Sequence, residues 1–298
     1  MMINTNCAIC GTPGNSKILY DSNISNDSFT VQVFSARRTP DQLRYQWVRC
    51  IECGLLRSDP VSKIDLEILY TNSSFDYSSE VAGLNKTYVK IFKKVMKNSN
   101  RIDSVFEVGG GNGFFLEELG KIGIPNLIEV EPSKNAISSA ISESKVHFIQ
   151  NIMKEGLIKE QSQDVSVMFH TLDHLPDPLD TLRLCMSALA PGGKFIAAVH
   201  NERAFSSSLL KYRSPIFDIE HTYLYNKATA KNLLMKAGFI NVGAHTYLNY
   251  YSFAYILHLL PLPLKFKSFI LQNRFGRILS KFKVWLPLGN IYIYGTKP

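Results

Sequence analysis

A chain of 298 residues is long enough for one large domain or two modest ones. Its 45% share of hydrophobic residues supplies a packed core and excludes a disordered protein. The formal net charge of +8 excludes no class of fold, because net charge bears on the partners of a protein rather than on its architecture.

The first residues contain no basic segment followed by an apolar one, and no apolar run is long enough to cross a bilayer. We therefore expect no secretory signal and a cytoplasmic location, where thiols stay reduced. In that setting, two C-x-x-C-G segments predict a structural zinc site, since four thiolates complete the tetrahedral shell of this ion. The four predicted ligands are Cys7, Cys10, Cys50 and Cys53.

These cysteines define a predicted zinc ribbon over residues 1–60, with a redox-active cysteine pair or unrelated thiols as alternatives. A ribbon can bind nucleic acid, but this one is not strongly cationic. Its aromatic residues alternate like strand residues rather than forming a stacking surface. We expect no nucleic-acid partner. Residues 61–100 are predicted to be a linker that enters cofactor-covering helices.

From residue 101 onward, apolar runs alternate with helical patterns, as a right-handed parallel sheet requires. This alternation predicts an α/β, doubly wound, mostly parallel sheet of seven strands, built from residues 101–247 and 289–298. The predicted strands are 103–108, 126–131, 146–150, 164–169, 193–199, 239–247 and 290–295. The predicted helices are 113–121, 133–142, 177–189 and 227–237.

The most informative stretch is the turn after the first of these strands. Glu107 is followed by four glycines in five residues, between Gly109 and Gly113. Such a turn lets backbone N–H groups and a helix N-terminus approach a polar ligand, where a Cβ would collide. Glu131 ends the next strand, at about the spacing at which a doubly wound fold offers a carboxylate to a ribose. A glycine turn with a purely steric role is the alternative.

Three segments together resemble the class I S-adenosylmethionine-dependent methyltransferases. They are E-x-G-x-G-x-G from Glu107, the acidic strand end at Glu131, and L-x-P-G-G from Leu189. The resemblance covers residues 100 to 245 and implies an antiparallel last strand, whereas the glycine spacing disfavours a nicotinamide oxidoreductase. The cofactor-binding residues that it implies are Glu107, Gly109, Gly111, Asn112, Gly113, Glu131, Pro132, Asn151, Ile152 and His170.

A ribbon ahead of such a domain resembles a bacterial group that acts on sugars and secondary metabolites. The segment around Tyr77 is similar to one that sugar C-methyltransferases lay over the cofactor. The pair Glu220 and His221 is similar to a patch of those enzymes in which His is the base and Glu orients it. A structural lid is the alternative for this pair. The segment from His170 to His174 resembles a turn of the family, where Asp173 and His174 could simply shape the loop.

Residues 248–288 form a predicted amphipathic insertion. A helical pattern places apolar residues from Leu271 to Phe282 on one face, with Arg274 and Arg277 on its flank. No Asp or Glu follows Glu220, so this stripe fits a helix on an anionic membrane surface. A lid or a dimer helix is the alternative.

We therefore predict a methyltransferase that uses S-adenosylmethionine and a small-molecule substrate. A sugar or lipid-linked glycan intermediate is the main expectation, and a quinone-like or secondary-metabolite acceptor is the alternative. A ribbon-containing nucleic-acid-binding or scaffold protein is the alternative from a different class. The sequence leaves the oligomeric state open.

Overall fold

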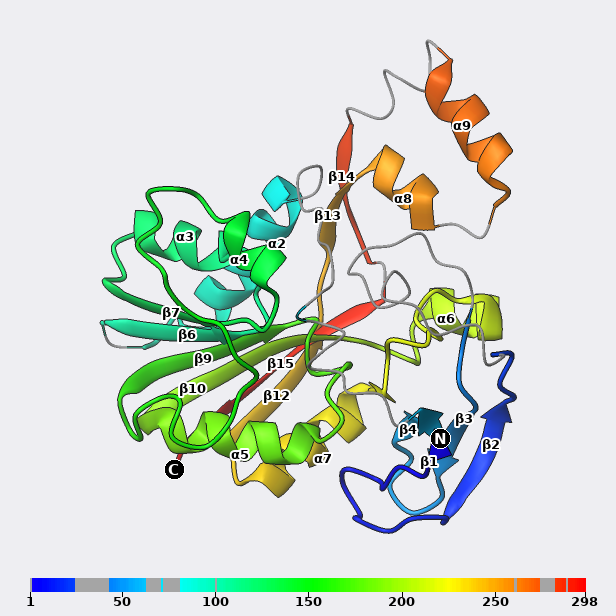
Figure 1. Ribbon diagram of the computed structural model, residues 1–298, viewed down its shortest axis with the longest axis horizontal. Coiled ribbons are helices and arrows are strands. Elements are labelled where there is room, and N and C mark those ends of the chain that lie inside the picture. Colours follow the sequence, from blue (N-terminus) through cyan, green and yellow to red (C-terminus); the bar gives the residue numbers. More distant parts are fainter. Residues whose placement is uncertain are drawn as a thin grey trace.

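The computed structural model describes residues 2–24, 43–62, 71, 81–99, 101–259, 262–273, 282–287 and 289–298. Its centre is a seven-stranded sheet with the strand order β12-β15-β10-β9-β6-β7-β8 (Figure 1). The strands are β6 (Ser104–Val108), β7 (Asn126–Val130), β8 (His147–Ile149), β9 (Gln163–Phe169), β10 (Leu189–His200), β12 (Ile240–Thr246) and β15 (Asn290–Thr296).

The predicted fold class is confirmed. Strands β8, β7, β6, β9 and β10 pair in parallel, and β15 lies antiparallel between β10 and β12. Most predicted strands agree with the observed ones within one or two residues. The exception is β10, which begins at Leu189 instead of residue 193, because Leu189 already pairs with Gln163 before an irregularity in the ladder.

Helices cover both faces of this sheet (Figure 1). The helices of the core are α2 (Val81–Val95), α3 (Phe114–Lys121), α4 (Lys134–Ser138), α5 (Pro178–Ala188) and α7 (Lys227–Ala237). Helix α4 is shorter than predicted. The hydroxyl of Ser139 donates to the carbonyl of Ala136, so side-chain bonding competes with further helical bonds at this end.

The core consists of two layers because successive side chains of a strand point to opposite faces of the sheet. Val105 and Val167 pack on the side of α2 and α3, together with Phe115. Phe106 and Met168, their chain neighbours, pack on the side of α5 and α7. Such double burial explains why these strands are nearly continuous apolar runs.

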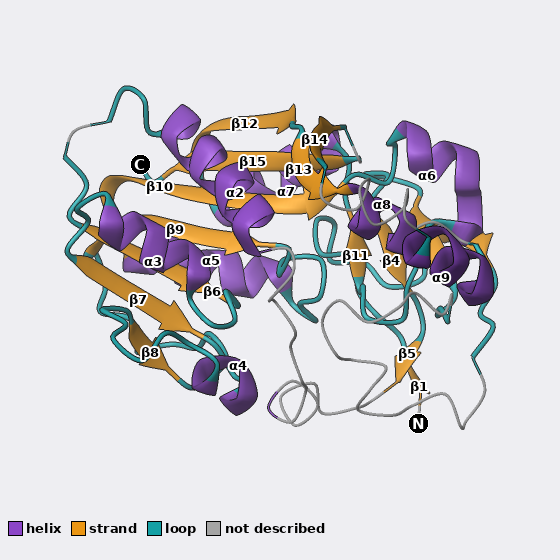
Figure 2. Ribbon diagram, turned by 90° about the horizontal axis from the view of Figure 1, so that it is seen from above, coloured by secondary structure: helices purple, strands orange, loops and turns teal. Residues whose placement is uncertain are grey.

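The N-terminal ribbon shares a four-stranded sheet with the main domain. The order is β11-β4-β3-β2, with β2 (Ser16–Tyr20), β3 (Trp47–Cys50), β4 (Leu56–Ser58) and β11 (Tyr223–Leu224). A short pair, β1 (Met2–Ile3) with β5 (Val61–Ser62), closes this end of the chain. Figure 2 shows the ribbon at the end of the molecule away from β7 and β8.

In its described residues, the segment between β12 and β15 contains a two-stranded sheet and two helices. They are β13 (Asn249–Ser252), α8 (Phe253–Leu259), α9 (Leu264–Gln272) and β14 (Lys283–Leu286), and α6 (Phe205–Leu210) with a 3-10 turn (Lys211–Arg213) precedes β11. Helix α9 ends at Gln272, and Phe282 directly precedes β14. The remainder of the predicted amphipathic stripe, with Arg274 and Arg277, lies outside the described residues. Among the residues that are described, no helix combines the length and apolarity needed to cross a bilayer.

Candidate functional site

The glycine turn joins β6 to α3 and has an unusual backbone. Gly109, Gly111 and Gly113 have φ angles of 74°, 72° and 73°, in the left-handed region that residues with a Cβ rarely adopt. Gly113 is also the residue that precedes the first turn of α3. The turn therefore lies at the carboxyl end of β6, where doubly wound folds bind ligands.

Glu131 lies directly against this turn. Its Oε2 accepts a hydrogen bond from the N–H of Gly111 at 3.0 Å, and its Oε1 accepts one from the N–H of Ser133 at 2.8 Å. Burial raises the pKa of this carboxyl to about 7, although both N–H donors favour the charged form. The structure thus brings together the two features on which the predicted cofactor site depends. Each carboxylate oxygen retains capacity to accept from a hydroxyl group.

Glu107 lies behind the turn, paired with a second buried acid that sequence reasoning missed. Glu129 occupies the neighbouring position on β7, and its Oε1 accepts from the N–H of Gly110 at 2.7 Å. Burial raises the pKa of Glu107 to about 8 and that of Glu129 well above its usual value. A Cβ at Gly110 would lie 2.4 Å from Cδ of Glu107, so only glycine fits above this pair. Acidic residues inside two apolar strands were the available signal.

The other predicted cofactor residues surround the same turn. Oδ1 of Asn112 is buried and makes no hydrogen bond within the described part of the chain. A Cβ at Gly113 would lie 2.8 Å from Phe148, so this glycine is required for packing. Asn151 and Pro132 are half-buried, and the side chain of Ile152 is exposed. Tyr77 lies outside the described residues.

Four histidines gather at the ends of β9 and β10 and in the loops that follow. Ring centroids of His170 and His200 are 4.7 Å apart, those of His200 and His221 are 4.8 Å apart, and those of His221 and His174 are 4.7 Å apart. Nε2 of His170 also lies 3.2 Å from the hydroxyl of Tyr247. The predicted site residues His170 and His221 therefore belong to one cluster. Its members come from separate segments of the chain.

Asp173 is the acidic centre of this cluster and is fully buried. Its Oδ2 accepts from the backbone N–H of His200 at 2.9 Å and lies 2.5 Å from Nδ1 of the same residue. Its backbone carbonyl accepts from the N–H groups of Thr222 and Tyr223, directly after His221. Sequence reasoning missed His200, which lies just beyond the predicted end of its strand.

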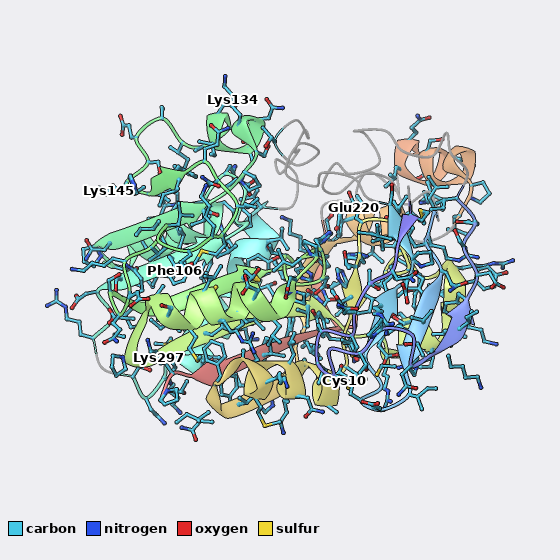
Figure 3. All side chains as sticks on the ribbon, turned by 60° about the horizontal axis from the view of Figure 1, so that its bottom comes forward. Cys10, Phe106, Lys134, Lys145, Glu220 and Lys297 are labelled. Carbon is cyan, nitrogen blue, oxygen red and sulfur yellow. The ribbon has the colours of Figure 1, made fainter. Side chains whose placement is uncertain are left out.

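His221 is oriented by the backbone. Its Nδ1 donates to the carbonyl oxygen of Ile216 at 2.9 Å, so the orienting hydrogen bond predicted from Glu220 comes from a different group. Burial holds the pKa of His221 well below its usual value, and burial lowers that of His174 to about 4. In Figure 3, Glu220 and Cys10 both lie in the half of the molecule that contains the N-terminal ribbon, whereas Lys145 lies at the opposite end.

The four ribbon cysteines converge on one point. Their sulfur atoms all lie within 4.8 Å of one another, with 3.4 Å between Cys7 and Cys53 and 3.9 Å between Cys10 and Cys50. Sulfur atoms around a tetrahedral zinc ion are about 3.8 Å apart, given zinc–sulfur bonds of about 2.3 Å. The donor set therefore fits such an ion.

The ribbon contacts the loop that carries His221. The hydroxyl of Ser58 donates to the carbonyl of His221 at 3.0 Å, and its N–H donates to the carbonyl of Thr222 at 2.9 Å. Arg49 makes two hydrogen bonds of 3.1 Å to the carboxylate of Glu202, which follows β10. The ribbon and the histidine cluster therefore form one structural unit.

With this geometry in view, comparisons with known proteins identify the family. A family model described as a methyltransferase domain matches residues 81–243. This match covers more than half of the chain, which therefore belongs to the methyltransferase-domain family.

Individual relatives are more distant. The ubiquinone biosynthesis O-methyltransferase of Xanthomonas campestris pv. campestris (strain B100) is 29% identical over 105 residues, which are 33% of this chain and 43% of the relative. The chain spans about half the length of the curated relatives that it matches.

Solved structures share the fold. The plantazolicin methyltransferase BpumL in complex with S-adenosylhomocysteine matches with a TM-score of 0.51 at 16% identity, over 74% of this chain and 85% of that one. A Haemonchus contortus phosphoethanolamine N-methyltransferase 2, also bound to S-adenosylhomocysteine, matches with a TM-score of 0.51 at 16% identity, over 78% of this chain and 57% of that one.

Proposed function

We propose that the protein transfers a methyl group from S-adenosylmethionine to a hydroxyl group of a quinone-like ring. The observation that carries the donor half of this proposal is the contact between the Glu131 carboxylate and the Gly111 N–H. This contact joins the glycine turn to the acidic residue that follows β7. Both features lie at strand ends of the seven-stranded sheet, in a chain that belongs to the methyltransferase-domain family.

The residues around the turn suit the parts of the methyl donor. Glu131 would accept from the ribose hydroxyls, and the glycine turn between Gly109 and Gly113 would receive the methionine part. Asn112 offers a buried carbonyl oxygen to an ammonium or hydroxyl donor. The exposed apolar side chain of Ile152 would lie against the adenine, next to Asn151.

The acceptor would lie over the histidine cluster at the neighbouring strand ends. The methyl carbon of a sulfonium is already activated, so the protein mainly supplies proximity, orientation and exclusion of water. A hydroxyl acceptor must also lose a proton, and an imidazole of this cluster is the side chain that can accept it. Glu220 directly precedes His221 in the sequence.

Two observations bear on the acceptor. Matched relatives are named ubiquinone biosynthesis O-methyltransferases, which favours an aromatic hydroxyl. The ribbon and the Glu220–His221 pair favour a sugar as the second candidate, because they resemble sugar methyltransferases.

We also propose that the four-cysteine cluster holds a structural zinc ion. Cys7, Cys10, Cys50 and Cys53 would fill all four positions and leave none for a substrate, so this ion would stabilise the ribbon and take no part in methyl transfer.

Calorimetric titration of the full chain with S-adenosylhomocysteine, and separately with NADH, tests the donor half. We expect binding of the first and none of the second, and we expect Glu131→Ala to weaken the first at least about tenfold, since hydrogen bonds to a charged group contribute about 1.5–3 kcal/mol. The matched control is Glu118→Ala, on the exposed face of α3. Binding of NADH alone would refute the proposal.

The acceptor half is tested by incubation with S-adenosylmethionine and either catechol or a nucleoside-diphosphate hexose. Mass spectrometry should detect a methylated catechol. Methylation of the hexose alone would replace the first acceptor with the second.

A further inference from the structure

We propose that His200, held by Asp173, is the base that removes the proton from the acceptor hydroxyl during methyl transfer. This inference rests on the proposed function and adds a residue that the sequence did not indicate. Asp173 acts as a positioning residue, because it contacts the imidazole and not the acceptor.

The hydrogen bonds of Asp173 fix the tautomer of His200. The same carboxylate oxygen, Oδ2, lies 2.5 Å from Nδ1 and 2.9 Å from the backbone nitrogen of His200. A carboxylate only accepts, so Nδ1 carries a proton, and in the neutral ring Nε2 therefore carries the lone pair. This is the arrangement in which a buried acid orients a histidine base and stabilises its charged form.

Exposure distinguishes the two members of the pair. The side chain of His200 is 22% exposed, whereas that of Asp173 is 0% exposed. His200 also ends β10, two strands from β6 and beside β9, so it lies at the edge of the sheet where the methyl donor is expected. Its Nε2 can therefore reach an acceptor while its carboxylate partner stays dry.

His221, the base predicted from the sequence, is less suited to take up a proton. Its side chain is buried, and its Nδ1 faces a neutral carbonyl rather than a carboxylate. Burial and the neighbouring His174 and His200 hold its pKa well below the usual value. In this assignment His221 is a neutral ring beside the base.

Several titratable groups face His200 from the surrounding elements. Burial holds the pKa of Tyr225 and of Tyr247 well above its usual value, so both phenols stay neutral donors. The groups are His170 at the end of β9, Asp173 and His174 in the loop before α5, and His221 before β11. The two phenols lie behind them: the hydroxyl of Tyr225 donates to the carbonyl of Leu172, and that of Tyr247 contacts His170. Asp173 is the carboxylate among them, and it stabilises an imidazolium at His200.

The step balances in atoms and charge. The acceptor oxygen forms a bond to the methyl carbon while the carbon–sulfur bond breaks. The electron pair of the broken bond remains on sulfur, which becomes a neutral thioether. The hydroxyl proton moves to Nε2 of His200. The positive charge of the sulfonium thus ends on the imidazolium, next to the carboxylate of Asp173.

Nuclear magnetic resonance of the full chain labelled with ¹⁵N-histidine, in the presence of S-adenosylhomocysteine, tests the geometry without an acceptor. We expect His200 to show the Nδ1–H tautomer in the unsubstituted protein and a larger share of the Nε2–H tautomer in Asp173→Asn, because the charged acceptor of the Nδ1 proton is lost. An Nε2–H tautomer in the unsubstituted protein, or an unchanged tautomer ratio in that variant, would overturn the proposal. This measurement tests the geometry of the Asp173–His200 pair even if catechol is not a substrate.

Turnover of catechol with S-adenosylmethionine tests the chemistry. We expect His200→Gln to lower kcat by about 10²–10⁴-fold and to abolish the limb of the pH profile that reports the base, while His221→Gln retains that limb. With 4-nitrocatechol, whose hydroxyl ionises near neutral pH, the loss in His200→Gln should be much smaller. An equal loss for both acceptors would indicate a merely structural role and refute the proposal.

Two controls separate this test from other failures. His245→Gln, the same substitution at an exposed position on β12, should leave kcat unchanged. The dissociation constant of S-adenosylhomocysteine should change less than about twofold in His200→Gln, since a base for the acceptor does not hold the donor. If the unsubstituted protein does not bind S-adenosylhomocysteine, the proposed function fails, whereas the Asp173–His200 geometry is still judged by the resonance experiment.

Discussion

Two parts of the carboxyl edge of the central sheet are built in opposite ways. The proposed donor edge, around β6 and β7, takes its glycines and carboxylates from one stretch of chain, residues 107–133. The proposed acceptor edge, around β9 and β10, draws its histidines from three separate segments, and the N-terminal ribbon contacts one of these. A local site depends on backbone conformation, whereas an assembled site depends on the packing of distant segments.

Removing the proposed zinc ion tests this dependence and should have the largest effect. We expect Cys50→Ser to lose bound zinc and methyl transfer, by at least about 100-fold, because structural zinc contributes about 10 kcal/mol or more to the folding of small metal domains. The ribbon strand β4 would then no longer pair with β11, next to His221. Binding of S-adenosylhomocysteine should persist at the donor edge. Elemental analysis and calorimetry check both expectations.

Cys185→Ala is the matched control, because this cysteine is buried and is not one of the four that converge on the proposed zinc site. It should keep its zinc. Equal loss of donor binding and methyl transfer in Cys50→Ser would contradict the separation of the two edges.

Gly110→Ala tests the donor edge itself. The added Cβ would lie 2.3 Å from Oε2 of Glu129, inside a packed pair of carboxyl groups. We expect the free energy of unfolding to fall by about 2–4 kcal/mol, as for other overpacked buried sites. Denaturant unfolding measures this.

The control for Gly110 is Gly156→Ala. Gly156 has a φ of 75° but no atom within 4 Å of the new Cβ, so only the left-handed conformation is penalised, at about 1 kcal/mol. Equal losses in the two variants would show that no steric conflict exists at the carboxyl pair.

The pH dependence of donor binding should be a smaller effect. Burial raises the pKa of Glu131 to about 7, so this carboxyl becomes protonated as the pH falls below that value and loses acceptor capacity for the ribose. We expect S-adenosylhomocysteine to bind about tenfold more weakly at pH 5.5 than at pH 8. In Glu131→Gln, calorimetry should find weaker binding that no longer depends on pH.

The same contrast explains which features the sequence could predict. The positions of the strands, and those of the glycine turn and Glu131 at strand ends, follow from local patterns, because periodicity and positive φ angles are properties of consecutive residues. The Asp173–His200 pair and the β4–β11 pairing join residues separated by 27 and more than 160 positions, so no local pattern contains them. The extent of α4 was overestimated because serine hydroxyls compete for its carbonyls.

The last prediction concerns the buried acids. Burial raises the pKa of Glu107 from 4.5 to about 8, so between these values the folded protein holds a proton that the unfolded chain releases. The free energy of unfolding should therefore decrease as the pH rises through this window, by at most about 1.4 kcal/mol per pH unit for one proton. Glu107→Gln stays neutral at every pH, and its decrease should be smaller by this contribution. Urea unfolding between pH 5 and 8.5 measures it, with Glu118→Gln as an exposed control that should retain the full decrease. A decrease that is unchanged in Glu107→Gln would mean that the carboxyl pair is ionised in the folded protein at neutral pH.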